Sequence, residues 1–100
     1  MSGEKSDAAL SPVNIAPVSP GAFLYDRIIA PRKLSLEEFG NIVGLAGKTI
    51  GGIVNCRKKV TSDTAFRLEM VTGVTQKQWL TMQMNYDIWL QKQKPPRKKK

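Results

Sequence analysis

The chain has 100 residues, a net charge of +8 from 16 Lys and Arg against 8 Asp and Glu, and no histidine. This length fits one domain. The lack of histidine excludes the commonest general base and the commonest metal ligand. The single cysteine, Cys56, cannot close an intramolecular disulfide or build a cysteine-rich zinc site. The composition therefore predicts a protein that is not an enzyme and has no cofactor, metal ion or small-molecule ligand.

The positive charge is concentrated at the C-terminal end. The net charges of three consecutive stretches are −1 for residues 1–19, +3 for residues 20–90 and +6 for residues 91–100. The Ser-, Ala- and Pro-rich start predicts a flexible N-terminal arm over residues 1–18. The basic run interrupted by prolines predicts a disordered tail over residues 93–100. Residues 19–92 remain as the folded domain, so the total charge is a poor measure of its affinity for nucleic acid.

The sequence has no feature typical of export or membrane insertion. Residues 1–10 carry mixed charge and lack the apolar region of a signal peptide. No stretch approaches the roughly 18 apolar residues of a membrane span. With one unpaired cysteine, the cytoplasm is the expected compartment.

The first helix is predicted over about residues 21–30. Ser19-Pro20 supplies an N-cap residue and a proline at the first helical position, and Pro31 ends the segment. Leu24 and Ile28 are expected on its inner face, because residues four apart share one side of an α-helix.

The second and third helices are joined by a glycine turn. Ser35 and Glu38 fit a capping box that begins the second helix, which is expected to end at Val43 with Gly44 as a left-handed C-terminal residue. The third helix is predicted over about residues 46–55. Its three glycines cost about 3 kcal/mol relative to alanine, so tertiary packing has to hold this helix.

Two further helices complete the domain. The fourth is predicted over residues 62–72, and its inward residues are expected to be Ala65, Leu68 and Val71. Thr75 and Gln78 fit a second capping box, which begins a fifth helix that ends at about Lys92. Because no segment alternates as a strand does, the prediction is an all-α fold of five helices.

The fifth helix has apolar residues on two opposite faces. At the helical spacing of about 100° per residue, one face holds Trp79, Met82, Tyr86, Trp89 and Leu90. The opposite face holds Leu80, Met84 and Ile88. A domain core needs one such face, so the second suggests contact with another molecule. Because closed two-fold dimers are the commonest soluble oligomers, we predict a homodimer formed through this helix, with the first set as its dimerisation residues.

The second and third helices together outline a helix-turn-helix. DNA-binding proteins of this kind lay the second helix of the pair in the major groove and hold phosphates with nearby basic groups. The basic turn Arg57-Lys58-Lys59 follows the third helix. The pattern alone also fits a small helical domain with an ordinary solvated loop.

Two sets of residues resemble a known family. The helix-turn-helix of the lambda-repressor-like (XRE) class is similar to Ser19-Pro20-Gly21, Leu34-Ser35, Glu38-Phe39, Val43-Gly44-Leu45, Thr49-Ile50 and Ile53. The C-terminal half of HigA-type antitoxins, from type II toxin–antitoxin modules, resembles Ser62-Asp63-Thr64-Ala65-Phe66-Arg67-Leu68, Trp79-Leu80, Gln83 and Tyr86-Asp87-Ile88-Trp89-Leu90. The likeness covers about residues 17–90.

The resemblance implies a five-helix homodimer with two roles. Such antitoxins bind and inhibit a small RelE-like toxin that cleaves messenger RNA, and they repress their own operon at a palindromic operator. Carried over position by position, the resemblance implies base-reading sites at Gly47, Lys48 and Gly52, with help from Thr49. It implies phosphate contacts from Lys48, Asn55, Arg57, Lys58 and Lys59.

Several positions depart from the family pattern. Gly47 and Gly52 have no side chain for a base edge, and each bidentate base contact contributes about 1–3 kcal/mol of discrimination. Leu36 stands where related domains place a phosphate-clamping glutamine. Cys56 stands where they place a glycine in the left-handed conformation, and it is read either as a passive small residue or as a redox sensor. The sequence thus predicts salt-sensitive phosphate binding with reduced base reading.

Two other functions fit the sequence. The first is a stand-alone XRE-type transcriptional repressor without a toxin partner. The second is a basic accessory protein that binds RNA or DNA non-specifically through its tail, in which case deletion of residues 93–100 abolishes binding.

Overall fold

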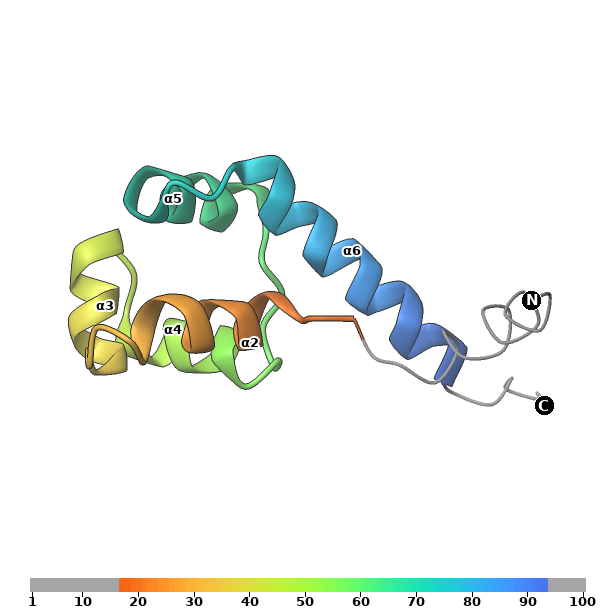
Figure 1. Cartoon of the computed structure of the whole chain (residues 1–100), viewed down its shortest axis with the longest axis horizontal. Helices are drawn as coiled ribbons and strands as arrows, with labels where there is room; N and C mark the ends of the chain where they lie inside the picture. The colour runs from red at the N-terminus through yellow and green to blue at the C-terminus, as the bar shows by residue number, and fades with distance from the viewer. Residues whose placement is uncertain (1–16, 94–100) are drawn as a thin grey trace, which may run out of the picture.

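The computed structural model of the chain describes residues 17–93, which form helices and no strand (Figure 1). The helices are α2 (Pro20–Leu24), the π-helical turn η2 (Tyr25–Ile29), α3 (Leu36–Val43), α4 (Gly47–Val54), α5 (Ser62–Thr72) and α6 (Gln76–Gln93). With α2 and η2 counted as one helix, the predicted five-helix, all-α fold is confirmed. The predicted arm and tail lie outside the described residues, except for residues 17, 18 and 93. None of the helices described here is long and apolar enough to cross a membrane.

The first helix differs from the prediction in its second half. The Ser19 hydroxyl caps α2 by accepting from the backbone N–H of Ala22 at 3.1 Å. The backbone N–H of Ala30 donates to the carbonyl of Tyr25 at 2.8 Å, five residues back, as in a π-helix. The wider turn brings Ile29 onto the buried side below Leu24, and Ile28 is only half-buried. Ile28 therefore packs against the core only in part, and Ile29 takes the fully buried position that the prediction did not include.

Both capping boxes are present. In α3, the Glu38 N–H donates to the Ser35 hydroxyl at 2.9 Å, and the Ser35 N–H donates to the Glu38 carboxylate at 2.8 Å. At the start of α6, Gln78 and Thr75 make the same reciprocal pair at 3.1 and 3.0 Å. Gly44 ends α3 with φ 81°, as expected for a left-handed C-terminal residue.

The core lies between α2 with η2, α3, α4, α5 and the start of α6. Its buried side chains are Leu24, Ile29, Phe39, Val43, Ile50, Ile53, Val60, Ala65, Leu68 and Trp79. Trp79 has no exposed surface, and its ring meets Phe23 edge to face with centroids 5.5 Å apart. It therefore belongs to the core of its own chain and has no surface left for a second subunit, which removes it from the predicted dimerisation set.

The buried side of α5 also differs from the prediction. Ala65 and Leu68 are fully buried as expected, but Val71 is 39% exposed. Thr64 is buried beside Ala65. The buried face of α5 is therefore formed by Thr64, Ala65 and Leu68. Val71 belongs to the outer surface.

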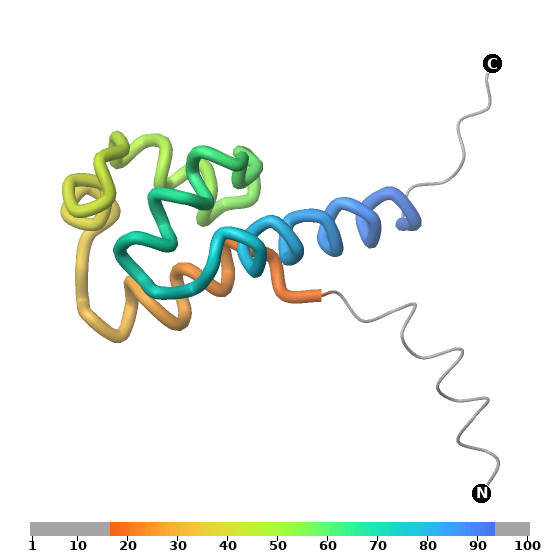
Figure 2. Tube along the Cα trace, turned by 90° about the horizontal axis from the view of Figure 1, so that it is seen from above, coloured from red at the N-terminus to blue at the C-terminus, as the bar shows by residue number. Residues whose placement is uncertain are grey.

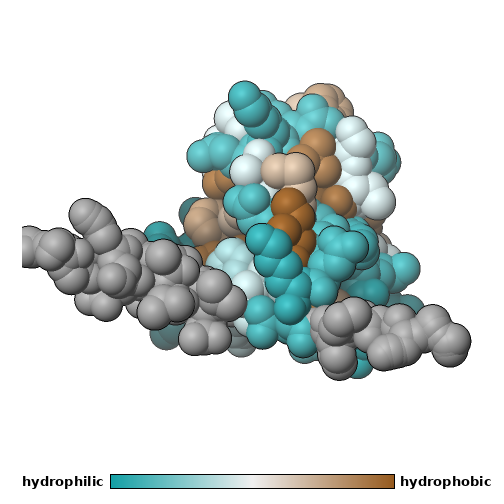
Figure 3. Space-filling view, turned by 90° about the vertical axis from the view of Figure 1, so that its right-hand side faces the viewer, coloured by the Kyte–Doolittle hydropathy of each residue, from teal (hydrophilic) through white to brown (hydrophobic). Residues whose placement is uncertain are grey.

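Helix α6 follows α5 and leaves the body of the molecule, so that its C-terminal half extends away from the other helices (Figures 1 and 2). A polar cluster holds it to the loop before α5. The Gln83 side chain accepts from the Val60 N–H at 2.8 Å and donates to Asp87 at 3.0 Å, and Asp87 pairs with Lys59 at 3.3 Å. Apolar surface forms a narrow strip between hydrophilic side chains at this end of the molecule (Figure 3). The position of α6 thus depends on the same loop that carries the basic residues.

Candidate nucleic-acid interface

Helices α3 and α4 pack closely across a tight turn, as a helix-turn-helix requires. The N–H groups of Gly44 and Leu45 both donate to the carbonyl of Gly40 at 2.8 Å, which turns the chain at once into α4. Gly40 is buried, and a side chain there would overlap the carbonyl oxygen of Leu45. The absence of a side chain at position 40 is therefore what allows the turn to close.

Most of the predicted DNA-binding residues lie on the surface of α4 and of the loop after it. Lys48, Asn55, Arg57, Lys58 and Lys59 are exposed, and Gly47 and Thr49 are half-buried. Gly52 is buried. The structure thus brings together one basic side chain from α4 and three from the following loop.

Packing explains the two glycines at the predicted base-reading positions. A Cβ on Gly47 would lie 3.1 Å from the Cα of Glu37, because the start of α4 approaches the backbone of α3. A Cβ on Gly52 would lie 3.0 Å from the Cγ of Lys58, whose aliphatic stem covers this position. A molecule that approaches α4 at residue 52 would therefore meet Lys58 before it meets the glycine backbone.

The basic loop is folded back over the end of α4. The N–H groups of Arg57 and Lys58 donate to the carbonyl of Gly52 at 2.7 and 3.0 Å. Cys56 takes the left-handed conformation with φ 62°, so the turn has the geometry expected of a glycine although a cysteine occupies it. This turn fixes the side from which the basic side chains leave the domain.

Cys56 lies between the start of α2 and the middle of α6. Its thiol donates to the hydroxyl of Ser19 at 3.5 Å. Burial raises the pKa of the Tyr86 hydroxyl, and the hydrogen bond with Cys56 raises this pKa further. Tyr86, Leu90 and Pro20 also line a cavity of about 50 Å³ beside Cys56. Tyr86 therefore faces its own domain, whereas Leu90, one turn further along α6, is 37% exposed.

The basic side chains of the loop differ in their partners. The Lys59 ammonium pairs with Asp87 of α6 at 3.3 Å. In the part of the chain that the structure describes, Arg57 and Lys58 have no such ion pair. Gln83 and Asp87 belong to the motif that resembles HigA-type antitoxins, but the sequence did not indicate that they position this loop.

The remaining predicted positions have mixed surroundings. Leu36 is half-buried and packs against the core, so its side chain contributes to folding. Met82 also packs partly on the core, and the Trp89 ring stacks on Tyr86 with centroids 5.9 Å apart. On the opposite side of α6, Met84 and Ile88 are exposed.

No family model matches the chain. An HTH-type transcriptional regulator of Escherichia coli (strain K12) is 29% identical over 73 residues, which cover 73% of this chain and 65% of that protein. The chain thus matches just under two thirds of that relative's length. Virulence-associated protein I of Dichelobacter nodosus is 30% identical over 76 residues, which cover 76% of this chain and 70% of that protein.

Solved structures define the family more narrowly than the sequence relatives do. An addiction module antidote protein of a HigA family from Coxiella burnetii matches with a TM-score of 0.71 and 26% identity, over 83% of this chain and 100% of that one. The chain belongs to the HigA-type antitoxin family of helix-turn-helix proteins. The antitoxin GraA matches this HigA-type chain with a TM-score of 0.76 and 26% identity, over 80% and 86% of the two chains. The Pseudomonas aeruginosa antitoxin HigA, solved with the higBA promoter, is 21% identical with a TM-score of 0.71 over 75% and 82% of the chains, and shares the fold.

Proposed function

We propose that this chain is a cytoplasmic antitoxin that binds and neutralises a cognate RelE-like, mRNA-cleaving toxin. We further propose that it represses its own operon as a homodimer by binding operator DNA through α3 and α4. The observation that carries the proposal is the match to the Coxiella burnetii HigA-family protein over 83% of this chain and all of that protein's length. The protein would act by binding its partners, without catalysis.

The DNA part of the proposal rests on the exposed residues of α4 and the loop. Lys48 and Thr49 are the residues of α4 that could contact base edges, whereas Arg57 and Lys58 would contact phosphates. Phosphate contacts give affinity that falls steeply with salt and carries no sequence information. We therefore expect measurable binding to operator DNA, with an affinity only slightly higher than the affinity for random DNA.

Co-expression tests the toxin part of the proposal. The small reading frames on either side of the gene are expressed alone and together with this chain. The expected result is growth arrest from one neighbour, relief of the arrest by this chain, and a complex of the two that survives purification. If neither neighbour product binds this chain or is neutralised by it, the proposal fails.

The alternative function is a stand-alone transcriptional repressor. The curated relatives that are named HTH-type transcriptional regulators are consistent with either function. Titration of promoter DNA against random DNA, together with the co-expression experiment, separates the two functions. Sequence-dependent binding without a toxin complex would identify the repressor.

A further inference from the structure

The middle of α6 contacts the basic loop, residues 55–61, which joins α4 to α5. Gln83, Tyr86 and Asp87 lie three and four positions apart, so they share one side of the helix. Each of them makes a hydrogen bond or an ion pair with a residue of the loop. None of the three is among the predicted DNA-binding residues, yet this side of α6 holds the loop that carries three basic ones.

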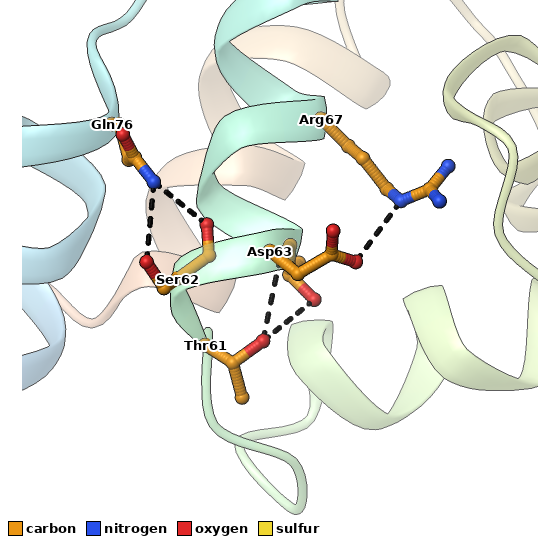
Figure 4. Close-up of polar contacts among 6 residues, drawn as sticks. Thr61, Ser62, Asp63, Arg67 and Gln76 are labelled. Carbon is orange, nitrogen blue, oxygen red and sulfur yellow. Dashed lines mark hydrogen bonds and ion pairs between the residues drawn. The ribbon is translucent and has the colours of Figure 1, made fainter.

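The C-terminal end of the loop and the start of α5 are fixed at three successive residues. The backbone N–H of Val60, which is 3% exposed, donates to the Gln83 side chain at 2.8 Å. The Thr61 hydroxyl caps α5 by accepting from a backbone N–H of the first turn at 3.4 Å. The Gln76 side chain donates to the carbonyl and the hydroxyl of Ser62 at 2.9 and 3.2 Å (Figure 4). The lysine that precedes these residues therefore extends from a fixed backbone.

The Gln83 amide also fixes the carboxylate of Asp87. Its oxygen accepts from the Val60 N–H, and its nitrogen donates to one Asp87 oxygen at 3.0 Å. Both contacts require the same orientation of the amide, since only its oxygen accepts and only its nitrogen donates. The second Asp87 oxygen lies 3.3 Å from the Lys59 ammonium. Gln83 thus holds a carboxylate beside the last lysine of the loop.

The pair with Asp87 cancels one positive charge of the loop. The Lys59 side chain is 70% exposed and that of Asp87 is 34% exposed. Exposed ion pairs are usually weak because two side chains have to be ordered. Here Asp87 is already held by Gln83, so that pairing orders only the lysine. A phosphate that contacted Lys59 would also approach the Asp87 carboxylate and be repelled by it.

The other two basic side chains of the loop lack such a neighbour. Among the residues that the structure describes, neither Arg57 nor Lys58 forms an ion pair. The aliphatic stem of Lys58 lies against Gly52 of α4, which places this lysine on the predicted DNA-binding surface itself. The loop therefore offers two unpaired cations to DNA and a third that α6 neutralises.

We propose that Asp87, positioned by Gln83, keeps Lys59 from contacting DNA phosphates, so that α6 sets how many phosphates the basic loop binds. This inference rests on the DNA binding of the proposed function and names a positioning residue outside the helix-turn-helix. Asp87 acts through Lys59 and itself makes no contact with DNA. Because phosphate contacts carry no sequence information, removal of this carboxylate would raise the affinity for any duplex.

Salt titration of DNA binding by the full chain tests this inference. Asp87→Asn removes the charge and keeps an oxygen that can accept from Gln83. The probes are a fluorescent duplex of the gene's own promoter and a random duplex of the same length. On both, the slope of log affinity against log salt should steepen by about 0.9, since one more phosphate is neutralised. Between about 50 and 200 mM salt, the affinity of the variant should therefore fall about 3.5-fold more than that of the wild type.

Two further variants separate this effect from a change in net charge. Asp26→Asn removes the same charge from an exposed position of η2, and its slope is expected to equal that of the wild type. Lys59→Gln combined with Asp87→Asn removes both members of the pair, and its slope should also equal that of the wild type. Urea unfolding checks that every variant is folded. The inference is overturned if Asp87→Asn leaves the slope unchanged, if Asp26→Asn steepens it equally, or if the double variant differs from the wild type.

The wild-type measurements keep this inference distinct from the proposed function. If the wild type binds both duplexes and Asp87→Asn does not steepen the slope, only the inference fails. If neither protein binds either duplex at low salt, operator binding fails and the inference fails with it. Co-expression with the neighbouring gene products measures the toxin part of the proposed function independently of both.

Discussion

Replacement of Cys56 by glycine is expected to stabilise the fold. Cys56 has φ 62°, in the left-handed region that costs an ordinary residue about 1–2 kcal/mol. Removal of this strain is offset by about 0.5–1 kcal/mol, because the unfolded protein has more conformational freedom with a glycine at position 56. The substitution also removes the thiol's contact with the Ser19 hydroxyl at 3.5 Å and its hydrogen bond with Tyr86, and sulfur is a weak partner in both. The expected net effect is an increase of about 0.5 kcal/mol in the free energy of unfolding.

Urea unfolding followed by circular dichroism measures this effect. The matched control is Cys56→Ala, which keeps the left-handed strain and loses the sulfur. The expected order of stability is glycine, then wild type, then alanine, and the two variants should differ by about 1 kcal/mol. Gly73 has φ 81°, and a Cβ added there would meet nothing within 4 Å, so it provides the reverse test: Gly73→Ala should lose about 1 kcal/mol. If Cys56→Ala proves as stable as Cys56→Gly, the turn is not strained and the reasoning is refuted.

Three further outcomes are expected. Gly21→Ala should lower the free energy of unfolding by about 3 kcal/mol, measured by urea, because its Cβ would overlap a backbone carbonyl of α4; Gly73→Ala, in open space, should lose less. Gln83→Leu should cost about 1–3 kcal/mol in the same assay, since the Val60 N–H loses its acceptor. Lys58→Gln should reduce the slope of log affinity for DNA against log salt by about 0.9. Lys59→Gln should reduce this slope less than Lys58→Gln does, because the Lys59 ammonium is already paired with the Asp87 carboxylate of α6. Equal slopes for the two variants would contradict this difference between the two lysines.

The local features of the fold could be predicted from the sequence. A capping box involves residues three apart, so Ser35 with Glu38 and Thr75 with Gln78 were visible without knowledge of the tertiary structure. Gly44 was predictable for the same reason, because the left-handed end of a helix favours glycine.

Features that depend on contacts distant in sequence could not be predicted. The π-helical turn replaces Ile28 by Ile29 on the buried side, and apolar spacing gives no sign of it because both residues are isoleucine. Either apolar face of α6 could have met the core, and only the packing of Trp79 on Phe23 shows which one does. The bond from Gln83 to the loop before α5 joins residues 23 positions apart.

For the predicted DNA-binding residues, the sequence indicated surface exposure better than it indicated their neighbours. The resemblance indicated the exposed basic residues of α4 and the loop, but gave no sign that Lys58 covers Gly52 or that Asp87 pairs with Lys59. The whole fold determines which groups lie within reach of a long flexible side chain, so sequence spacing does not determine these contacts.

The most direct test of the proposed function is a messenger RNA cleavage assay. The toxin product encoded beside this gene is purified and titrated with this chain, and RNA fragments are measured at each ratio. The expected result is cleavage that falls in proportion to added chain and stops when every toxin molecule is bound. Cleavage that continues unchanged in an excess of folded chain would contradict the proposal that this HigA-type protein is an antitoxin.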